Sequence, residues 1–359
     1  MRCLIFLIAA ATGMAQSAPQ TRISRITENL RGVSVVSGKV AWASGTHGTY
    51  LRTTDGHLWI PDHVAGAESL DFRGIAAVSA DEAFLMSAGP GDQSRIYHTS
   101  DAGRHWQLQF TNTNPKGFFD SMVFWDRTHG IVLGDPIPDE TGQLRFEILI
   151  TDDGQTWVAA PSAQLPPAID GEGAFAASNS CIAILRSESA TAALNPNIWF
   201  ATGGKAARVF HSADRGHSWE VFDTPITHGP DSAGVFSIAF RDATHGVIAG
   251  GDYKLPEQDG PNLAFTDDGG KTWTLSKIFP QSYYSAVAYD RKSKPKDKDE
   301  LRDRLFLVGP KFVYDFRPPR NPTRISAKKK SDSEFNAVSP YPGGGALVVG
   351  PKGVIINVP

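Results

Sequence analysis

Apolar residues in this chain occur in short runs that favour β-strands over helices. Each run lasts only a few residues and is separated from the next by Gly, Pro, Asn, Asp or Ser. The clearest set has four consecutive runs, at residues 235–240, 245–250, 262–266 and from Trp273 onward. Comparable sets precede and follow it along most of the chain. The pattern therefore predicts an all-β protein built from repeated units of four short strands.

Two further observations support a repeat. Residues 30–37 (LRGVSVVS) align with residues 72–79 (FRGIAAVS), which marks the beginning of two equivalent units. Tryptophans at positions 59, 106, 157, 219 and 273 are separated by 47, 51, 62 and 54 residues. Self-similarity at this period, with four short strands in each repeat, predicts a single β-propeller with one blade per repeat.

These tryptophans end a recurring motif, Ser/Thr-x-Asp-x-Gly-x-Thr/Ser/His-Trp. Residues 99–106, 212–219 and 266–273 follow it in full, residues 150–157 (ITDDGQTW) keep all but the first position, and residues 53–59 (TTDGHLW) are one residue short. In such a turn the Asp side chain accepts hydrogen bonds from backbone N–H groups just ahead of it, and Gly supplies a positive φ. We expect the motif acids to stabilise hairpin turns; they are Asp55, Asp101, Asp152, Asp214 and Asp268.

The motif resembles the Asp-box, also called the bacterial neuraminidase repeat. The sequences LRTTDGHLW and AFTDDGGKTW are most similar to those of propellers of the photosystem II stability and assembly factor family, and more distantly to those of sialidases. The resemblance extends over five repeats and most of the chain, and it implies a β-propeller fold. It implies little about activity, because Asp-boxes form turns in propellers with and without enzymatic activity.

The order of the strands predicts seven blades of four antiparallel strands, with six or eight as alternatives. Blade four is expected to begin at residues 173–177 and to carry an insertion at about 186–196, and blades six and seven lack the Asp-box. The last unit has three strands, whereas the alternating residues 21–26 form an extra strand before the first unit. We therefore expect residues 21–30 to complete the last blade and to close the ring, which removes an open sheet edge.

The first residues resemble a signal peptide, so the propeller is expected to span residues 16–359. Met1-Arg2-Cys3 precedes an apolar run at 4–11, and residues 13–15 (GMA) end in a small-x-small pattern. We expect cleavage after Ala15 and a periplasmic or extracellular protein. The apolar run is too short to span a bilayer. Cleavage leaves Cys181 as the single cysteine, and its apolar surroundings predict a buried, inert thiol.

Residue composition and net charge argue against several classes of ligand. Without a spaced cluster of His or Cys, we expect no metal and no cofactor. The net charge of −3 does not support binding to nucleic acid or to a membrane surface. Two charged stretches, residues 291–304 and 328–332, are expected to be solvated loops, with docking of an acidic partner as the alternative. We expect a monomer.

The candidate site lies on the face of the ring opposite the Asp-box turns. There the beginnings of the innermost strands, and the loops between second and third strands, surround the mouth of the central channel. The expected innermost-strand residues are Arg31, Arg73, Asp120, Glu172, Tyr284 and Asn336, and the expected loop residues are His47, Asp135, Asp252, Lys311 and Lys352. Long loops at residues 134–145 and 250–261 are expected to wall this face. The alternative is that these polar residues only line a water-filled channel.

Two functions fit this arrangement. The family resemblance implies a non-catalytic scaffold that binds a protein partner through Arg31 and Arg73, whose guanidinium groups suit a carboxylate. The alternative is a sialidase-like or other Asp-box glycoside hydrolase acting on an acidic glycan, in which Asp120 or Glu172 serves as acid or base and Tyr284 as nucleophile. Residues 30–33 (LRGV) stand where sialidases carry Phe/Tyr-Arg-Ile-Pro, so we favour the scaffold. The arginines are alternatively blade-locking groups, paired with an acid such as Asp71 or Asp120.

Overall fold

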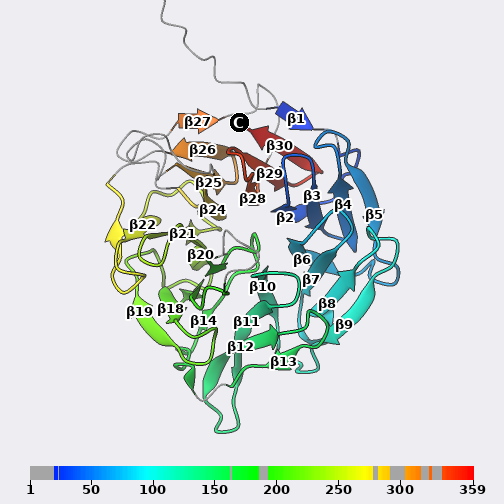
Figure 1. Cartoon of the computed structure of the whole chain (residues 1–359). Helices are drawn as coiled ribbons and strands as arrows, with labels where there is room; N and C mark the ends of the chain where they lie inside the picture. The colour runs from blue at the N-terminus through cyan, green and yellow to red at the C-terminus, as the bar shows by residue number, and fades with distance from the viewer. Residues whose placement is uncertain are drawn as a thin grey trace, which may run out of the picture.

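The computed structural model is a ring of seven antiparallel sheets of four strands each, and one of these sheets carries two additional short strands (Figure 1). The structure describes residues 20–22, 24–161, 164–185, 193–277, 282–291, 304–316, 323–325 and 334–359. Within these ranges no helix is long and apolar enough to cross a membrane. The seven-bladed, all-β propeller predicted from the sequence is confirmed.

In each of the first three blades the first strand lies nearest the axis and the fourth forms the outer edge (Figure 1). Blade one comprises β2 (Leu30–Val35), β3 (Ala41–Gly45), β4 (Thr49–Thr53) and β5 (Ile60–His63). Blade two comprises β6 (Asp71–Ala77), β7 (Ala83–Ala88), the 3-10 turn η1 (Gly91–Gln93), β8 (Arg95–Thr99) and β9 (Gln107–Thr111). Blade three comprises β10 (Phe119–Phe124), β11 (Gly130–Pro138), β12 (Leu144–Thr151) and β13 (Val158–Ala159).

The remaining blades follow the same order. Blade four comprises β15 (Ile182–Ile184), β16 (Ile198–Ala201), β18 (Arg208–Ser212) and β19 (Glu220–Asp223). Blade five comprises β20 (Ala233–Phe240), β21 (Gly246–Asp252), β22 (Leu263–Thr266) and β23 (Thr274–Leu275), and its sheet is extended by β17 (Gly203–Gly204) and β14 (Glu172–Gly173). Blade six comprises β24 (Ala286–Tyr289), β25 (Leu305–Gly309), β26 (Phe312–Phe316) and β27 (Thr323–Ile325). Blade seven comprises β28 (Ala337–Pro340), β29 (Ala346–Gly350), β30 (Val354–Val358) and the N-terminal β1 (Gln20–Arg22).

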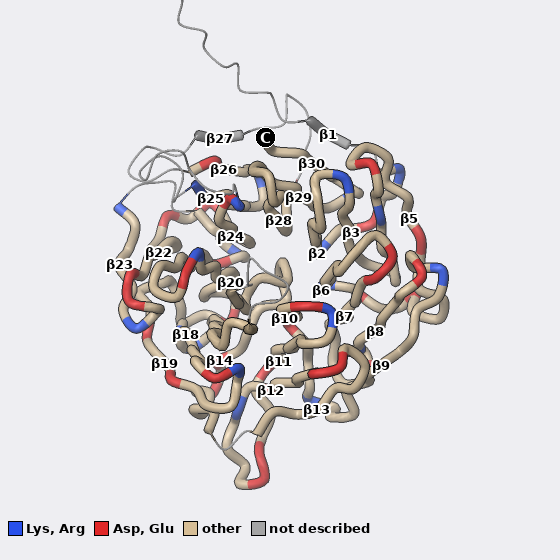
Figure 2. Tube along the Cα trace, viewed as in Figure 1, with Lys and Arg blue, Asp and Glu red and all other residues tan. Residues whose placement is uncertain are grey.

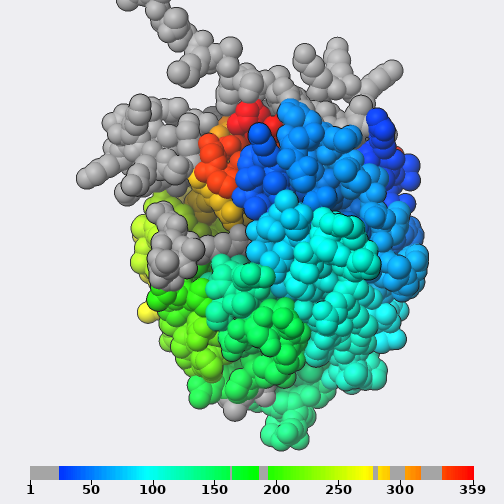
Figure 3. All heavy atoms as spheres, turned by 45° about the vertical axis from the view of Figure 1, so that its right-hand side comes forward, coloured from blue at the N-terminus to red at the C-terminus, as the bar shows by residue number. Residues whose placement is uncertain are grey.

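The N-terminal strand closes the ring, as the sequence predicted. β1 runs antiparallel to β30, with Gln20 opposite Asn357 and Arg22 opposite Ile355. The Ser24 hydroxyl donates a hydrogen bond to the Gly353 carbonyl at 2.7 Å and fixes the chain next to the same strand. In Figure 3 the red atoms of the C-terminal blade adjoin the blue atoms of the first blade.

Ring closure gives a direct prediction. A chain that begins at Ser24 lacks β1, so β30 becomes an open sheet edge and the three residue pairs of β1 with β30 are lost. We expect its thermal midpoint to fall by several degrees in circular dichroism, relative to a chain that begins at Gln20 and retains β1. Equal midpoints would show that β1 does not hold the ring together.

The core lies between neighbouring blades rather than at one centre. Alternate side chains of each strand point to opposite faces of its sheet, so each sheet contributes to two interfaces. The rings of Trp199 and Phe240 stack at 3.7 Å between blades four and five, and those of Phe84 and Phe124 stack at 4.1 Å between blades two and three. The central axis of the ring is therefore surrounded by polar residues and by the beginnings of the innermost strands.

The prediction for the start of blade four was wrong. Its innermost strand is β15 (Ile182–Ile184), not residues 173–177. Residues 174–180 form instead a segment that crosses the central channel, which we call the axial segment. The sequence misled because blade four lacks the Arg-Gly match that marks blades one and two. Most of the predicted insertion at 186–196 lies outside the described residues. The predicted signal peptide and the two charged stretches lie almost wholly outside them as well.

Candidate functional site

The mouth of the channel is shaped by a β-bulge that recurs in four innermost strands. Register with the second strand shifts between Leu30 and Gly32, Phe72 and Gly74, Phe119 and Ser121, and Val235 and Ser237. The extra residues are Arg31, Arg73, Asp120 and Phe236. A bulge re-aims its side chain, and here the equivalent residues of four blades are presented at one end of the ring. Ser285 and Asn336 occupy the same place in blades six and seven.

A small residue follows each bulged position because the innermost strands approach one another closely. A Cβ added at Gly32 would lie 2.7 Å from Ser44 Oγ and 2.9 Å from the Arg73 carbonyl oxygen. Steric fit therefore requires glycine at position 32. This restriction explains why the match between residues 30–37 and 72–79 is the clearest in the chain.

The two arginines share one carboxylate. Arg73 Nε donates to Asp71 Oδ2 at 2.7 Å, and Arg73 Nη1 donates to the Ala176 carbonyl at 3.1 Å. Arg31 Nε lies 3.9 Å from the same Asp71 oxygen and is buried without a hydrogen-bond partner among the described residues. Burial, and next the charge of Arg73, lower the pKa of Arg31. Arg73 is thus held locally, whereas Arg31 retains unused donors.

Two acids lie beneath the arginines. Burial raises the pKa of Asp135 to about 6, although its Oδ1 accepts a hydrogen bond from the Ala174 N–H at 2.9 Å. Asp120 is 1% exposed, and its pKa lies well above the usual range because of burial and the nearby charge of Asp135. Asp120 Oδ2 has no hydrogen-bond partner among the described residues. Asp120 is thus closed off from solvent, whereas Asp135 is only partly buried.

The axial segment forms the floor of the mouth. Asn179, at φ 59°, accepts a hydrogen bond from the Met122 N–H at 2.7 Å and donates to the Met122 carbonyl at 3.0 Å. Ser178 Oγ donates to the Ser285 carbonyl at 2.8 Å, and the Ser180 and Ser237 hydroxyls lie 2.7 Å apart. The segment therefore joins blades three, five and six across the channel. Sequence reasoning missed it; its one signal is the polar run 178–180 immediately before the apolar β15.

An aromatic surface faces the arginines across the mouth. The ring of Phe236 stacks on Phe175 at 3.8 Å and contacts Tyr283 edge-on at 4.8 Å. The Tyr253 ring lies 6.1 Å from Phe236, and Tyr253 is 48% exposed. Burial raises the pKa of Tyr283, and the charge of Arg31 acts in the opposite direction. We call Arg31, Asp71 and Arg73 the arginine side of the mouth, and Phe175, Phe236, Tyr253 and Tyr283 its aromatic side.

Glu172 is not at the mouth, contrary to the prediction. It lies on β14 and forms an ion pair with Arg208, with Nε–Oε1 at 3.0 Å and Nη2–Oε2 at 2.5 Å. Thr202 Oγ1 and the Ile169 N–H also donate to its carboxylate, at 2.6 and 2.9 Å. These hydrogen bonds hold Glu172 in a buried structural network. The prediction failed because it took residues 173–177 for an innermost strand, which they do not form.

Tyr284 is also placed differently from the prediction. It is fully buried among apolar residues between blades five and six, and burial raises its pKa. Its neighbour Tyr283 packs edge-on against Phe236 instead. The three residues of the glycosidase alternative, Asp120, Glu172 and Tyr284, therefore lie in three separate buried environments and do not surround a common pocket.

The other predicted residues lie at the rim or between blades. Asn336 Nδ2 donates to Asn29 Oδ1 at 2.8 Å and to the Leu30 carbonyl at 2.7 Å, which ties blade seven to blade one. The remainder are rim residues: His47 Nδ1 is 2.6 Å from Glu28 Oε2, Asp252 Oδ1 accepts from the Lys254 N–H at 2.9 Å, Lys311 pairs with Glu257, and Lys352 is exposed.

The Asp-box acids lie on the opposite face, and one assignment needs correction. Asp268 Oδ1 accepts hydrogen bonds from the Lys271 and Thr272 N–H groups, both at 3.0 Å. In blade three this role belongs to Asp153, not Asp152: Asp153 Oδ1 accepts from the Gln155 and Thr156 N–H groups, both at 2.7 Å. The turn begins at Thr151, so this copy has the shorter spacing of residues 53–59.

The two adjacent acids of blade three provide a matched test. Hydrogen bonds from the Thr156 and Gln155 N–H groups lower the pKa of Asp153 to about 2, so the turn prefers the ionised acid. We expect Asp153→Ala to lower the urea midpoint and Asp152→Ala to leave it unchanged. Equal effects would contradict the assignment of the turn to Asp153.

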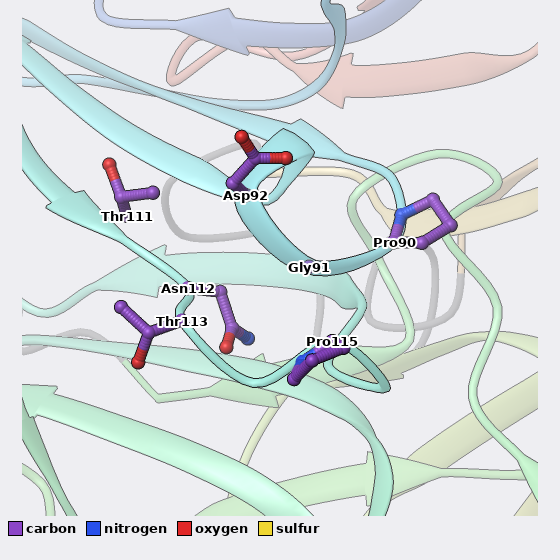
Figure 4. Close-up of a pocket in the computed structure, with 7 residues that line it drawn as sticks. All are labelled: Pro90, Gly91, Asp92, Thr111, Asn112, Thr113 and Pro115. Carbon is purple, nitrogen blue, oxygen red and sulfur yellow. The ribbon is translucent and has the colours of Figure 1, made fainter.

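Two cavities in the described part of the chain lie away from the mouth. One, of about 460 Å³, lies between the turn that carries Asp92 and the loop that carries Thr113 (Figure 4). The other, of about 390 Å³, lies between blades five and six and includes Arg241 and Tyr289. In the described part of the chain no three His, Cys, Asp or Glu residues are grouped to hold a metal ion. Lys and Arg are interspersed with Asp and Glu around the ring (Figure 2).

Comparison with known proteins supports the architecture. No protein-family model and no curated protein matches the sequence. Among solved structures, YCF48 bound to a D1 peptide is similar with a TM-score of 0.65 at 14% identity, covering 96% of this chain and 98% of that one. A streptogramin B lyase gives a TM-score of 0.62 at 9% identity (95% and 97% covered), and the WD40 propeller domain of Doa1 gives 0.61 at 11% (96% and 97%). The likeness is one of fold. Since a peptide-binding protein and a lyase both share it, function must be argued from the site.

Proposed function

We propose that this protein is a non-catalytic scaffold that binds a protein partner at the mouth of its channel, in the manner of the photosystem II assembly factor type of propeller. The observation that carries the proposal is Arg31, whose side chain is 18% exposed and whose Nε has no hydrogen-bond partner among the described residues, at a mouth whose other side presents the partly exposed ring of Tyr253. The bulges, the Asp71 bridge and the axial segment hold these groups on a rigid frame. Rigid placement reduces the entropy lost on binding.

The fold likeness to YCF48 bound to a D1 peptide is consistent with this proposal. We further propose that the protein acts in the periplasm or outside the cell as a monomer, after cleavage near Ala15. Sequencing of the mature N-terminus in the exported fraction tests the location, and sedimentation of the purified protein tests the oligomeric state.

The binding proposal is tested by charge reversal. Full-length tagged protein is cross-linked in cells, and the co-purified proteins are quantified for the wild type, Arg31→Glu and the double variant Arg31→Glu with Arg73→Glu. We expect both variants to lose a specific partner. Lys39→Glu, the same charge change at an exposed residue on the Asp-box face, should retain it.

Thermal unfolding of each variant separates binding from stability. If Arg31→Glu unfolds the protein, Arg31 is a strut between blades and the site must lie elsewhere. If Arg31→Glu stays folded and retains every partner, the proposal is wrong.

A further inference from the structure

We propose that the cavity between blades five and six binds a neutral saccharide. Its volume of about 390 Å³ lies within the range of roughly 300–1,000 Å³ that is usual for small-molecule sites. Its walls include Thr266, Asp267 and Thr274, which belong to or adjoin the Asp-box turn of blade five. The cavity therefore lies on the face opposite the mouth, and this inference is independent of the proposed function.

The first argument is that the equivalent corner between blades three and four is packed with apolar side chains. Strand register matches four residues of one corner with four of the other. In blades three and four these residues belong to one core cluster; they are Trp125, Ile150, Ile184 and Ile198. In blades five and six they line the cavity; they are Arg241, Phe265, Tyr289 and Leu305. Polar groups and a cavity thus occur together at a corner that is otherwise apolar.

The second argument concerns His245, whose ring is held in place at the wall of the cavity. Asp242 Oδ1 accepts a hydrogen bond from the His245 backbone N–H at 2.8 Å and lies 2.9 Å from His245 Nδ1. The same turn, with the sequence Asp-x-Thr-His-Gly, occurs at residues 126–130, where Asp126 holds His129. Only His245 of this pair lines the cavity. Because the carboxylate engages Nδ1, the Nε2 atom of His245 is left for a ligand.

The third argument is the variety of hydrogen-bonding groups on the walls. The Arg241 guanidinium donates, the Asp267 carboxylate accepts, and the hydroxyl groups of Thr274 and Tyr289 can do either. Burial raises the pKa of Tyr289, so its hydroxyl remains protonated at neutral pH. A ligand that carries several hydroxyl groups can satisfy donors and acceptors of both kinds at once.

The charges and the apolar walls narrow the ligand further. Asp242 Oδ2 lies 3.4 Å from Arg241 Nε, and Asp267 adds a second negative charge, so an anionic ligand gains little. A cationic ligand would be repelled by Arg241. The remaining walls, Phe265 and Leu305, are apolar and suit the C–H face of a ring. A neutral sugar residue combines hydroxyl groups with such a face.

The experiment uses the full chain and an array of neutral oligosaccharides of glucose, galactose, mannose, xylose and N-acetylglucosamine, with sialylated and uronic-acid glycans as acidic counterparts. We expect binding to a subset of the neutral glycans and weaker binding to the acidic ones. Isothermal titration calorimetry with the neutral oligosaccharide that binds most strongly then gives the affinity of each variant. Arg241→Trp, which introduces the side chain found at the equivalent corner of blade three, should lower this affinity at least tenfold.

Two smaller changes test individual groups on the wall. His245→Ala should lower the affinity at least tenfold, and Tyr289→Phe, which removes one hydroxyl group, should lower it several-fold. The matched control is His129→Ala, because it removes the same side chain from the same turn in blade three. This control should bind like the wild type.

Thermal unfolding of every variant separates loss of binding from loss of the fold. If Arg241→Trp does not fold, His245→Ala and Tyr289→Phe decide the question against His129→Ala. The inference is overturned if no neutral glycan binds, if the acidic glycans bind more tightly, or if His245→Ala and Tyr289→Phe bind like the wild type. Equal losses in His245→Ala and His129→Ala would also overturn it, because they would assign the effect to the turn and not to the cavity.

Discussion

Replacing Arg208 by alanine is expected to cost about 3–5 kcal/mol of stability, because breaking a buried ion pair leaves the other charge uncompensated. Side-chain exposure is 11% for Arg208 and 0% for Glu172, and the two groups are joined by two hydrogen bonds. Arg208 Nη2 also donates to the Pro167 carbonyl at 2.9 Å, which would be lost as well. Guanidinium chloride unfolding followed by tryptophan fluorescence measures the loss.

A double variant distinguishes an ion-pair effect from loss of packing. Glu172→Gln with Arg208→Met removes both charges and keeps similar volume, and such replacements are often close to neutral. We expect it to recover most of the stability lost in Arg208→Ala. A double variant as unstable as Arg208→Ala would show that packing over Phe210, whose ring centroid is 5.0 Å from the guanidinium carbon, matters more than the charges.

Asp135→Asn is expected to stabilise the protein at pH 7. The folded protein holds the pKa of Asp135 at about 6, above its ordinary value of 3.8. The folded state therefore binds more protons than the unfolded state between these values, and the free energy of unfolding falls as pH rises from about 4 to about 6. Asparagine removes this penalty and keeps an oxygen for the Ala174 N–H. The expected gain is about 1–3 kcal/mol at pH 7, since one pKa unit corresponds to about 1.4 kcal/mol.

Denaturant unfolding of wild type and Asp135→Asn at pH 4 and pH 7 measures this effect; the gain should be small at pH 4. Asp139 provides a control of opposite sign, because hydrogen bonds from Thr141 and Arg145 lower its pKa. Asp139→Asn should destabilise at pH 7, and its effect should fade as the pH falls below about 4. A gain for Asp135→Asn that is equal at both pH values would contradict the account.

The architecture was predictable because it repeats. Tryptophans that recur every 47 to 62 residues and the match of residues 30–37 with 72–79 show the length of one repeat, and one repeat corresponds to one blade. The three-stranded last unit likewise predicted the closing strand, since an open edge is unfavourable. Blade four departs from the repeat, so its innermost strand and Glu172 were misplaced.

The site was less predictable because it depends on local geometry. The positions of Arg31, Arg73 and Asp120 could be anticipated by alignment, but the bulge that presents them has no clear sequence signal. Phe236 occupies the same position between Val235 and Ser237, yet a search for polar residues passes over it. Tyr283 and Tyr284 are adjacent and both precede β24 (Ala286–Tyr289), so the strand pattern does not tell which of them is buried between blades. Asp152 and Asp153 are also adjacent. Which of them accepts the hydrogen bonds of the turn depends on a one-residue difference in turn length, which the sequence pattern does not show.

The pairing of β1 with β30 also determines how the ring responds to mechanical force. Gln20 lies opposite Asn357, so the first residue of β1 and the last residues of β30 lie at the same end of this antiparallel pair. Tension between them peels the strands apart one hydrogen bond at a time, instead of shearing all of the bonds together. The first rupture in a single-molecule pulling experiment should therefore occur at low force and release only β1, before any other blade lengthens.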